Sequence, residues 1–198
     1  MKILKRSFFE HQTLRVARNL LGKKLVRRYK GHSLSGMVVE TEAYCGTDDS
    51  ACHAFKGKTP RNEIMFGQAG IAYVYFTYGL HYLLNVVTET ENKPCAVLLR
   101  AILPLQGRHQ MEKLRVKRGK SLTNGPAKLC QALAIDVSFK GWDLTQGQTL
   151  WLEKYQIIPD RFIGSGPRIG ISYAAPQDRE ALWRFWVQEE FIAKLKIG

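Results

Sequence analysis

Three polar side chains interrupt segments that otherwise consist mainly of apolar residues. Glu42 lies in "VVETEAY", Asn85 in "HYLLNVV" and Arg100 in "AVLLRAIL". Burying a charge without a partner costs several kcal/mol, and an unpaired buried amide costs about 1–3 kcal/mol. We therefore expect each of these side chains either to bind a partner or to face a hydrated cavity.

The pair formed by Glu42 and Arg100 could do chemistry on water. A carboxylate held near a guanidinium in a polar pocket can bind a water molecule and remove its proton. The alternative is a structural salt bridge between the two, with the Asn85 amide satisfied by backbone groups, because such pairs also occur outside active sites. Taken together, the three polar positions favour the water-activating interpretation.

Glu40 lies two positions before Glu42, so in a regular strand both carboxylates and Tyr44 would share one face. Two carboxylates that flank a bond can act as the acid and the base of sugar hydrolysis. Side chains two positions apart on one strand flank a substrate poorly, however, and Glu40 could equally pair with an arginine. The sequence therefore favours this interpretation less.

The stretch "AYVYFTYG" is crowded with aromatic residues. On a strand, Tyr73 and Tyr75 point to one face, whereas Phe76 and Tyr78 point to the other. Tyr73 and Phe76 are predicted to pack in the core. Tyr78 immediately precedes Gly79, so its ring is predicted to project from the tip of a hairpin, as does a side chain that wedges between DNA bases.

Further flat rings lie close by in the sequence, at Tyr44 and His53. A buried tyrosine needs a partner for its hydroxyl whether it packs in the core or lines a pocket. The residue pattern therefore leaves both interpretations open for Tyr44, His53 and Tyr75.

The chain is strongly basic. Its 198 residues include 30 Lys and Arg against 17 Asp and Glu, a formal net charge of +13. This excess indicates attraction to polyanions, with nucleic acid as the first candidate and anionic membrane as the second. Most charge runs are merely solvated faces, but a DNA-phosphate contact is the more economical interpretation here. The candidate residues lie on or near a predicted basic helix: Arg108, Arg115, Lys117, Arg118 and Lys128.

Several classes of protein are disfavoured by what the sequence lacks. No apolar run approaches the roughly 18–20 residues that span a bilayer, and the first residues lack the continuous apolar region of a signal peptide. The four cysteines form no C-x-x-C pair, so we expect buried, reduced thiols, no metal site and no cofactor. A zinc-dependent nucleobase deaminase would need an H-x-E motif with a downstream P-C-x-x-C, which is missing. We expect an intracellular protein that is not secreted and is located with the DNA, in the cytoplasm or nucleoid, or in a eukaryotic nucleus.

The elements that must position these residues suggest one α+β domain over residues 1–198, with a mainly antiparallel sheet. Two strands are predicted over 23–44 around a turn near residues 30–32, and a hairpin over 71–88 turns at 78–79. Single strands are predicted over 95–103 and 183–187. Helices are predicted over 11–22, ending at Gly22, over 47–54, over 105–120 and over 125–135, the last with Asn124 as its N-cap and Pro126 in its first turn.

Four segments together resemble the alkyladenine (3-methyladenine) DNA glycosylase family. They are "VETEAYCGTDDSACHAFKGKTPRN", "GIAYVYFTYGLHYLLNVV", "AVLLRAILPLQG" and "NGPAKLCQALAI". The resemblance runs in order from about Leu14 to "RIGIS" at 168–172, and "WRFWV" fits the closing strand of the family. It implies a curved, mainly antiparallel sheet with flanking helices and a protruding hairpin that inserts into DNA.

The resemblance also implies roles for individual residues. Glu42 matches the general base that activates the attacking water, and Arg100 matches the arginine that helps to hold this water. Tyr78 matches the residue that enters the minor groove and fills the gap left by the extruded base. The base pocket is implied to consist of three rings and an amide: Tyr44, His53, Tyr75 and Asn85.

The implied activity is base-excision repair. An alkylated or deaminated purine is flipped out of duplex DNA and its N-glycosidic bond is hydrolysed, leaving an abasic site without lyase cleavage. The implied partner is double-stranded DNA containing damaged purines, bound by a monomer without an obligatory protein partner and away from membranes. The alternative is a non-enzymatic minor-groove DNA-binding or damage-recognition protein, in which Glu42 and Arg100 form a structural pair. The sequence does not select a lesion among 3-methyladenine, 7-methylguanine, hypoxanthine and etheno-adenine.

Overall fold

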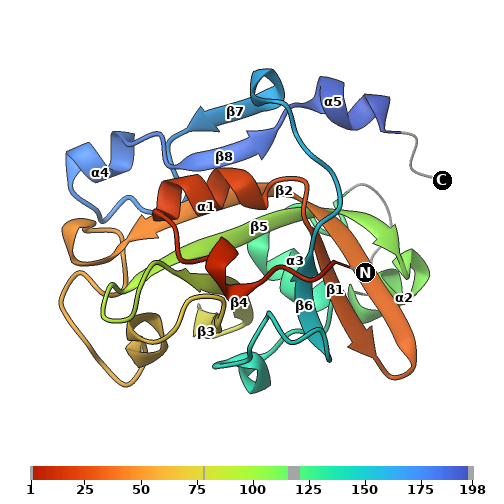
Figure 1. Ribbon diagram of the computed structural model, residues 1–198, viewed down its shortest axis with the longest axis horizontal. Helices are drawn as coiled ribbons and strands as arrows, with labels where there is room; N and C mark the ends of the chain where they lie inside the picture. Colours follow the sequence, from red (N-terminus) through yellow and green to blue (C-terminus); the bar gives the residue numbers. More distant parts are fainter. Residues whose placement is uncertain (1, 78, 116–120, 196–198) are drawn as a thin grey trace.

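A computed structural model of the protein describes residues 2–77, 79–115 and 121–195. Its α+β fold is built on an eight-stranded antiparallel sheet in the order β3-β4-β5-β2-β1-β6, with β8 pairing with β2 and β7 (Figure 1). The predicted fold class is confirmed. The strands are β1 (Lys24–Tyr29), β2 (His32–Cys45), β3 (Ala72–Thr77), β4 (His81–Thr88), β5 (Cys95–Gln106), β6 (Leu150–Glu153), β7 (Ile163–Gly166) and β8 (Arg184–Val187).

Short helices surround this sheet. The α-helices are α1 (Thr13–Leu20), α2 (Arg108–Arg115), α3 (Pro126–Ala132), α4 (Pro176–Glu180) and α5 (Glu189–Lys194). Single 3-10 turns lie at Arg6–Phe8, Gly46–Asp48, Glu63–Phe66, Val137–Phe139 and Asp160–Phe162.

Strand β2 joins the two parts of the sheet. Along one edge it pairs with β5, and along the other it pairs first with β1 and then, over residues 40–42, with β8. Register shifts in the β2–β5 ladder fall between Val38 and Glu40 and between Glu40 and Thr41. The long strand thus carries its C-terminal half into the centre of the molecule, with neighbours on both sides.

Helix α1 lies across β2 and β5 (Figure 1). Its buried residues Val16, Ala17 and Leu20 follow helical spacing, and the Thr41 hydroxyl of β2 donates a hydrogen bond to the Ala17 carbonyl. Gly22 follows the helix with φ of +79°, where a Cβ would lie 2.5 Å from the Gln156 carbonyl oxygen. The predicted helix and its glycine stop are confirmed.

Both predicted hairpins are confirmed. The β1–β2 turn places Lys30 at φ of +45° and Gly31 at +79°, the signs required by a two-residue turn that matches the twist of its strands. Strands β3 and β4 pair from Ala72 to Thr77, and the strands predicted over 95–103 and 183–187 appear as β5 and β8.

One helix prediction was wrong, and another had the wrong start. Residues 47–54 form a 3-10 turn followed by hydrogen-bonded turns, because Asp49 bonds the backbone N–H groups of Cys45 and Ala51 and pairs with distant Arg168. The helix predicted over 105–120 begins only at Arg108, since β5 continues its pairing with β2 up to Gln106. Its described part ends at Arg115.

The start of α3 also differs from the prediction. Pro126 does occupy the first turn, but the N-cap is Gly125 rather than Asn124. The Asn124 side-chain oxygen instead accepts a hydrogen bond from Lys128 Nζ at 3.0 Å. A side-chain partner has therefore replaced the predicted cap interaction.

Phe76 is a further correction. Its side chain is 49% exposed and contacts Tyr82 with a ring-centroid distance of 5.0 Å, so it does not pack in the core. Tyr73, on the other face of β3, is 2% exposed, as predicted. The alternation of faces was right, but the face that carries Phe76 is covered only at Ala72 and Val74, nearer the start of the strand.

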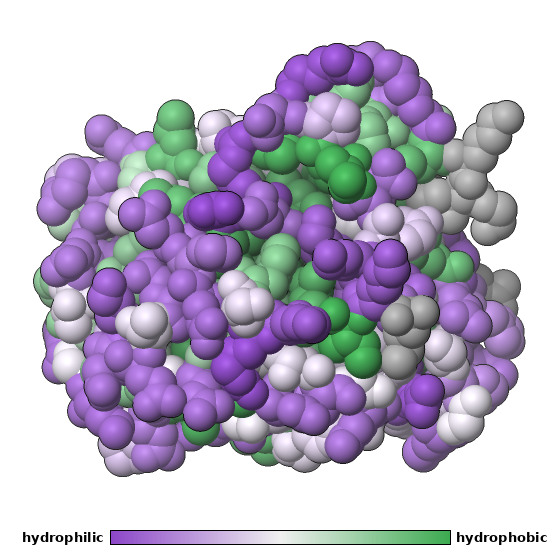
Figure 2. Space-filling view, in the orientation of Figure 1, coloured by the Kyte–Doolittle hydropathy of each residue, from purple (hydrophilic) through white to green (hydrophobic). Residues whose placement is uncertain are grey.

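The surface agrees with the composition. Figure 2 shows a face on which hydrophilic side chains predominate and apolar ones form separate patches. Among the described residues, no helix has both the length and the apolar character needed to cross a membrane.

Candidate active site

A cavity of about 480 Å³ opens on the sheet face that carries Glu42 and Tyr44. Thr41 points toward α1, so its neighbours on β2 point to the opposite face. The cavity is lined by residues of β2, β3, β4, β5, α3, the 3-10 turn at Glu63–Phe66 and two loops: Tyr44, Ala51, Cys52, His53, Met65, Tyr73, Tyr75, Thr77, His81, Leu83, Asn85, Ala96, Leu98, Arg100, Pro126, Ala127, Ile169, Gly170, Ile171 and Tyr173. Five predicted site residues are therefore brought together: Tyr44, His53, Tyr75, Asn85 and Arg100.

One side of the cavity is a cluster of rings. Tyr73 and Tyr75 share a face of β3, with centroids 5.3 Å apart, and His53 meets Tyr75 edge-on at 4.5 Å. The His53 Nδ1 lies 2.8 Å from the Tyr73 hydroxyl, which fixes the orientation of the imidazole. The Arg61 guanidinium lies 5.2 Å from the Tyr75 ring centroid.

The protonation of these rings follows from their surroundings. Burial, and then the Arg61 charge, lower the pKa of His53 to about 4, so its imidazole is neutral at pH 7. Burial raises the pKa of Tyr73 to about 12 and also raises that of Tyr75. At neutral pH this side of the cavity therefore presents uncharged aromatic groups.

Glu42 is completely buried and does not itself line the cavity, although its partners Tyr44, Arg100 and Ile169 do. Its Oε1 accepts a hydrogen bond from the Ile169 N–H at 2.7 Å and lies 3.2 Å from Arg100. Its Oε2 accepts a hydrogen bond from the Tyr44 hydroxyl at 2.9 Å. Three donors from separate parts of the chain therefore hold this carboxylate.

Burial raises the pKa of Glu42 above its ordinary value, and this effect outweighs the opposing influence of Arg100, the Ile169 N–H and the Tyr44 hydroxyl. Glu42 is thus more basic than an exposed glutamate. That change favours a group whose task is to accept a proton.

Arg100 bridges two carboxylates. Its Nε lies 3.1 Å from Glu40 Oε1, while its Nη1 contacts Glu42 Oε1. Arg184 from β8 also contacts Glu40 at 3.1 Å. Glu40 and Glu42 therefore lie on one face, as predicted, and Glu40 pairs with arginines rather than facing Glu42 across a substrate.

Asn85 is 4% exposed. Its amide nitrogen donates a hydrogen bond to the Tyr73 carbonyl at 3.1 Å, across the β3–β4 pair. The predicted backbone partner is therefore present, and the side chain also lines the cavity.

The loop at residues 167–173 contributes groups that the sequence did not single out. Ile169, Gly170, Ile171 and Tyr173 line the cavity, and the Ile169 N–H reaches Glu42. The only sequence signal was the short match "RIGIS" in the family resemblance. A backbone N–H leaves no side-chain pattern, so residue types alone could not identify this donor.

The predicted DNA-backbone residues are dispersed. Arg108 pairs with Glu112 one turn later at 3.2 Å, and Arg115 donates hydrogen bonds to the Ser121 and Leu122 carbonyls. Lys128 bonds Asn124. Tyr78, Lys117 and Arg118 lie outside the described residues.

Metal ligands are not gathered in the described part of the chain: no group of three or more His, Cys, Asp or Glu could hold an ion. The four cysteines are free, and all except Cys45, which is half-buried, are buried. Burial raises the pKa of Cys52 to about 11 and that of Cys130 to about 12. These thiols therefore stay protonated at neutral pH.

Comparison with known proteins adds independent information. Residues 7–191 match the family model for methylpurine-DNA glycosylase. A protein from Carboxydothermus hydrogenoformans is 45% identical over 97% of this chain and 99% of its own length. One from Chlorobium phaeobacteroides is 46% identical over 94% of each chain, and one from Methanocella arvoryzae is 45% identical over 94% of this chain and 92% of its own. All three are provisionally named 3-methyladenine DNA glycosylase.

Proposed function

This chain belongs to the methylpurine-DNA glycosylase family, and from that membership we propose that it hydrolyses the N-glycosidic bond of damaged purines with water activated by Glu42. It is a DNA glycosylase, a hydrolase that acts in base-excision repair of alkylated bases. Our proposal concerns the residues that do the chemistry, the range of purines and the product.

The observation that carries the proposal is the setting of Glu42. An ionised carboxylate has about four acceptor sites, and the described donors from Ile169, Arg100 and Tyr44 occupy three of them. One site remains for the proton of a water molecule. Because Arg100 and Ile169 also line the cavity, a water bound beside them would lie next to both the carboxylate and the substrate.

The proposed reaction follows from this arrangement. The flipped nucleotide enters the cavity, and its C1′–N bond breaks as the electron pair leaves with the base. The sugar becomes cationic, which the negative charge of Glu42 stabilises. Glu42 then takes one proton from water while the oxygen bonds to C1′, and the product is an abasic site. None of the described residues lining the cavity is a lysine, which supports a reaction without a Schiff base or strand cleavage.

The ring side of the cavity supports selection of purines with weakened glycosidic bonds. Alkylation at a ring nitrogen makes a purine cationic, so it leaves readily and is attracted to tyrosine faces by about 0.5–2 kcal/mol. Extruding a base costs a few kcal/mol, least when it is damaged. We propose that Tyr44, His53 and Tyr75 stack on the base and that Asn85 obstructs guanine through its exocyclic amino group.

DNA engagement completes the proposal. Tyr78, which follows β3 in the sequence, would fill the gap left by the extruded nucleotide. The basic residues of α2 and α3, together with Lys117 and Arg118, would contact phosphate.

The decisive variant is Glu42→Gln, assayed by single-turnover release of 7-methylguanine from a duplex that carries one such base. We expect the rate to fall by about 10²–10⁴-fold, while affinity for the duplex stays within a few-fold. Glu40→Gln is the matched control because it removes a carboxylate from the same strand and the same arginine. A near-normal rate for Glu42→Gln would refute the assignment, and strand cleavage without alkali would refute the monofunctional product.

A further inference from the structure

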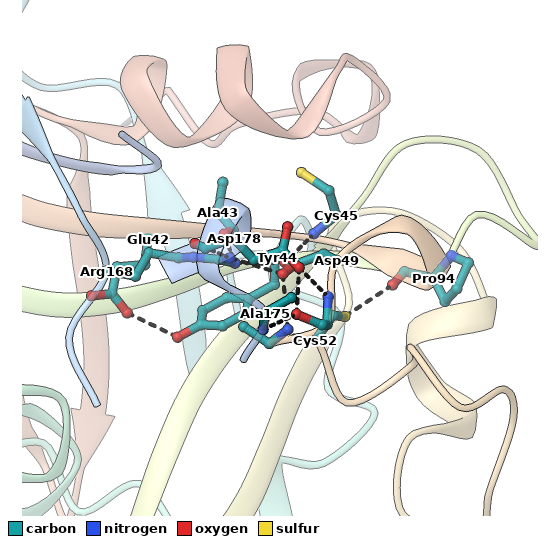
Figure 3. A network of polar contacts seen from close by, with 12 residues as sticks. Glu42, Ala43, Tyr44, Cys45, Asp49, Cys52, Pro94, Arg168, Ala175 and Asp178 are labelled. Atoms are coloured by element: carbon teal, nitrogen blue, oxygen red, sulfur yellow. Dashed lines mark hydrogen bonds and ion pairs between the residues drawn. The ribbon is translucent and has the colours of Figure 1, made fainter. Parts of the chain in front are cut away.

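Arg168 forms a second buried charge cluster just behind the proposed catalytic carboxylate (Figure 3). Its side chain is fully buried, and its guanidinium lies 4.8 Å from the ring centroids of both Tyr44 and Trp183. A planar cation between two aromatic rings is held in position and in orientation.

Asp49 completes the cluster from the loop after β2. Its two carboxylate oxygens accept hydrogen bonds from both terminal nitrogens of Arg168, at 2.5 and 2.8 Å. Asp49 is itself fixed by the N–H groups of Cys45 and Ala51, each at 3.0 Å. Arg168 also donates to the Ala43 carbonyl at 2.9 Å. The pair therefore ties the loop at 167–173 to the end of β2.

This tie reaches Glu42 by two short routes. The residue after Arg168 is Ile169, whose N–H donates to Glu42 Oε1 at 2.7 Å. The ring beside the Arg168 guanidinium is Tyr44, whose hydroxyl donates to Glu42 Oε2 at 2.9 Å. Two of the three described donors to the carboxylate are thus positioned by one guanidinium.

A buried ion pair is a poor device for stability alone, because apolar side chains of similar volume often stabilise as well or better. It does impose direction, since a bidentate pair fixes both partners in a plane. Four acceptor contacts and two ring contacts on one side chain fix the start of the loop at residues 167–173 against the end of β2 and its neighbours.

We propose that Asp49 and Arg168 are positioning residues that hold the Ile169 N–H and the Tyr44 hydroxyl against the carboxylate of Glu42. This inference rests on the proposed function, in which Glu42 activates water. Neither Asp49 nor Arg168 lines the cavity, so they act only through the two donors.

Positioning of the two donors affects the protonation of Glu42. Hydrogen bonds to a carboxylate favour its charged form, so losing the Ile169 and Tyr44 donors raises the pKa of Glu42 further. As the pH is lowered, the rate of base release then begins to fall at a higher pH than in the unaltered enzyme. The other charged or titratable groups that influence Glu42 are Arg100 from β5 and Glu40 from its own strand, with Arg184 from β8 acting through Glu40.

The test is the pH profile of single-turnover release of 7-methylguanine, a cationic leaving group that needs no protonation. For Asp49→Asn we expect the acid limb to move upward by about one pH unit, which makes the rate about tenfold lower on the acid side. Arg168→Lys keeps a buried cation opposite Asp49 but loses the planar, bidentate contact. It should therefore fold even if Asp49→Asn does not, and it should shift the limb in the same direction.

The matched control is Asp178→Asn. Asp178 belongs to the same cluster and is 7% exposed, but its side chain bonds Ser50 and only its backbone carbonyl contacts Arg168. This variant should lower the melting temperature without moving the acid limb.

The outcomes distinguish a failure of the positioning role from a failure of the proposed function. If Glu42→Gln abolishes release while Arg168→Lys lowers only the melting temperature and leaves the limb in place, the positioning role is wrong and the proposed function stands. If Glu42→Gln retains the rate, the proposed function itself fails. A shifted limb for Arg168→Lys and an unshifted one for Asp178→Asn support the inference.

Discussion

The two sides of the cavity are built on different principles. On the β2 and β5 side, charged groups lie at hydrogen-bond distance from one another, with Glu42 held by Arg100, Tyr44 and Ile169. On the β3 side, rings meet at edges and tilts, with His53 and Tyr75 centroids 4.5 Å apart. Directional contacts fix atoms to a few tenths of an ångström, whereas ring contacts tolerate changes of shape.

This difference suggests a division of tasks. A reaction with one nucleophile needs a single geometry for the water and the base that activates it. Recognition of several damaged purines needs surfaces that accept different substituents. A comparison of variants on the two sides can test whether chemistry and recognition separate in this way.

The largest expected effect lies on the ionic side. Arg100→Met removes the cation beside Glu42, so the pKa of that carboxylate rises further and the water loses one partner. We expect about a hundredfold slower single-turnover release at pH 7, with little change in duplex affinity.

Arg184→Met is the control for this prediction, because the Arg184 side chain contacts Glu40 and the Pro167 carbonyl, whereas Arg184 pairs with Glu42 only through the backbone. It should slow release by only a few-fold. Equal losses for Arg100→Met and Arg184→Met would show that the whole arginine–glutamate cluster, rather than the contact with Glu42, matters.

The next effect concerns stability on the ring side. The pKa of His53 is about 4 in the folded protein and about 6.5 in the unfolded chain. Because the folded-state pKa is depressed, the contribution of neutral His53 is complete above about pH 6.5 and is lost as the pH falls toward 4.

His53→Gln should remove on the order of 2 kcal/mol of that pH-dependent loss. Urea unfolding at several pH values between about 7 and 4.5 measures it, and His32→Gln, at the exposed β1–β2 turn, is the comparison variant. If the free energy of unfolding depended on pH with the same slope in both variants, neutral His53 would make no pH-dependent contribution to stability.

The smallest effect should come from one ring face. Tyr75→Leu removes a stacking surface worth about 1–3 kcal/mol per base, so we expect release to slow by roughly tenfold. The loss should be greater for cationic 7-methylguanine than for neutral hypoxanthine, because cation–π attraction is also lost.

Phe76→Leu provides the matched change at an exposed position on the opposite face of β3 and should alter release by less than about twofold. If Tyr75→Leu slowed both substrates as much as Arg100→Met does, the proposed division between the two sides would not hold.

Residues close together in sequence carried most of what could be predicted. Strand alternation placed Tyr73 in the core, and the Lys30–Gly31 turn fixed the first hairpin. The juxtaposition of Glu42 and Arg100 could be inferred because both polar groups interrupt apolar strands and each needs a partner. The first two rules act within a few residues, whereas the third joins distant positions only because each buried charge needs a partner.

The parts that could not be predicted depend on distant contacts. Asp49 and Arg168 are separated by 119 positions, and their pairing overrides the local helix signal of residues 47–54. The prediction for Phe76 failed for another reason: apolar residues need not be buried, and Phe76 lies near the end of β3, beyond the covered positions Ala72 and Val74 of the same face. The sequence placed Arg108 on a helix but did not show that its side chain pairs with Glu112, four residues later.

The position of Glu42 in the sheet has a consequence for local unfolding. Its backbone pairs with Leu98 of β5 on one side and Arg184 of β8 on the other, whereas β3 begins the strand order and has β4 as its only neighbour in that order. Segments with fewer neighbours open at lower free energy than central ones. We therefore expect the β3–β4 hairpin to open at a lower free energy than the centre of the sheet, which holds Glu42, the residue proposed to activate water.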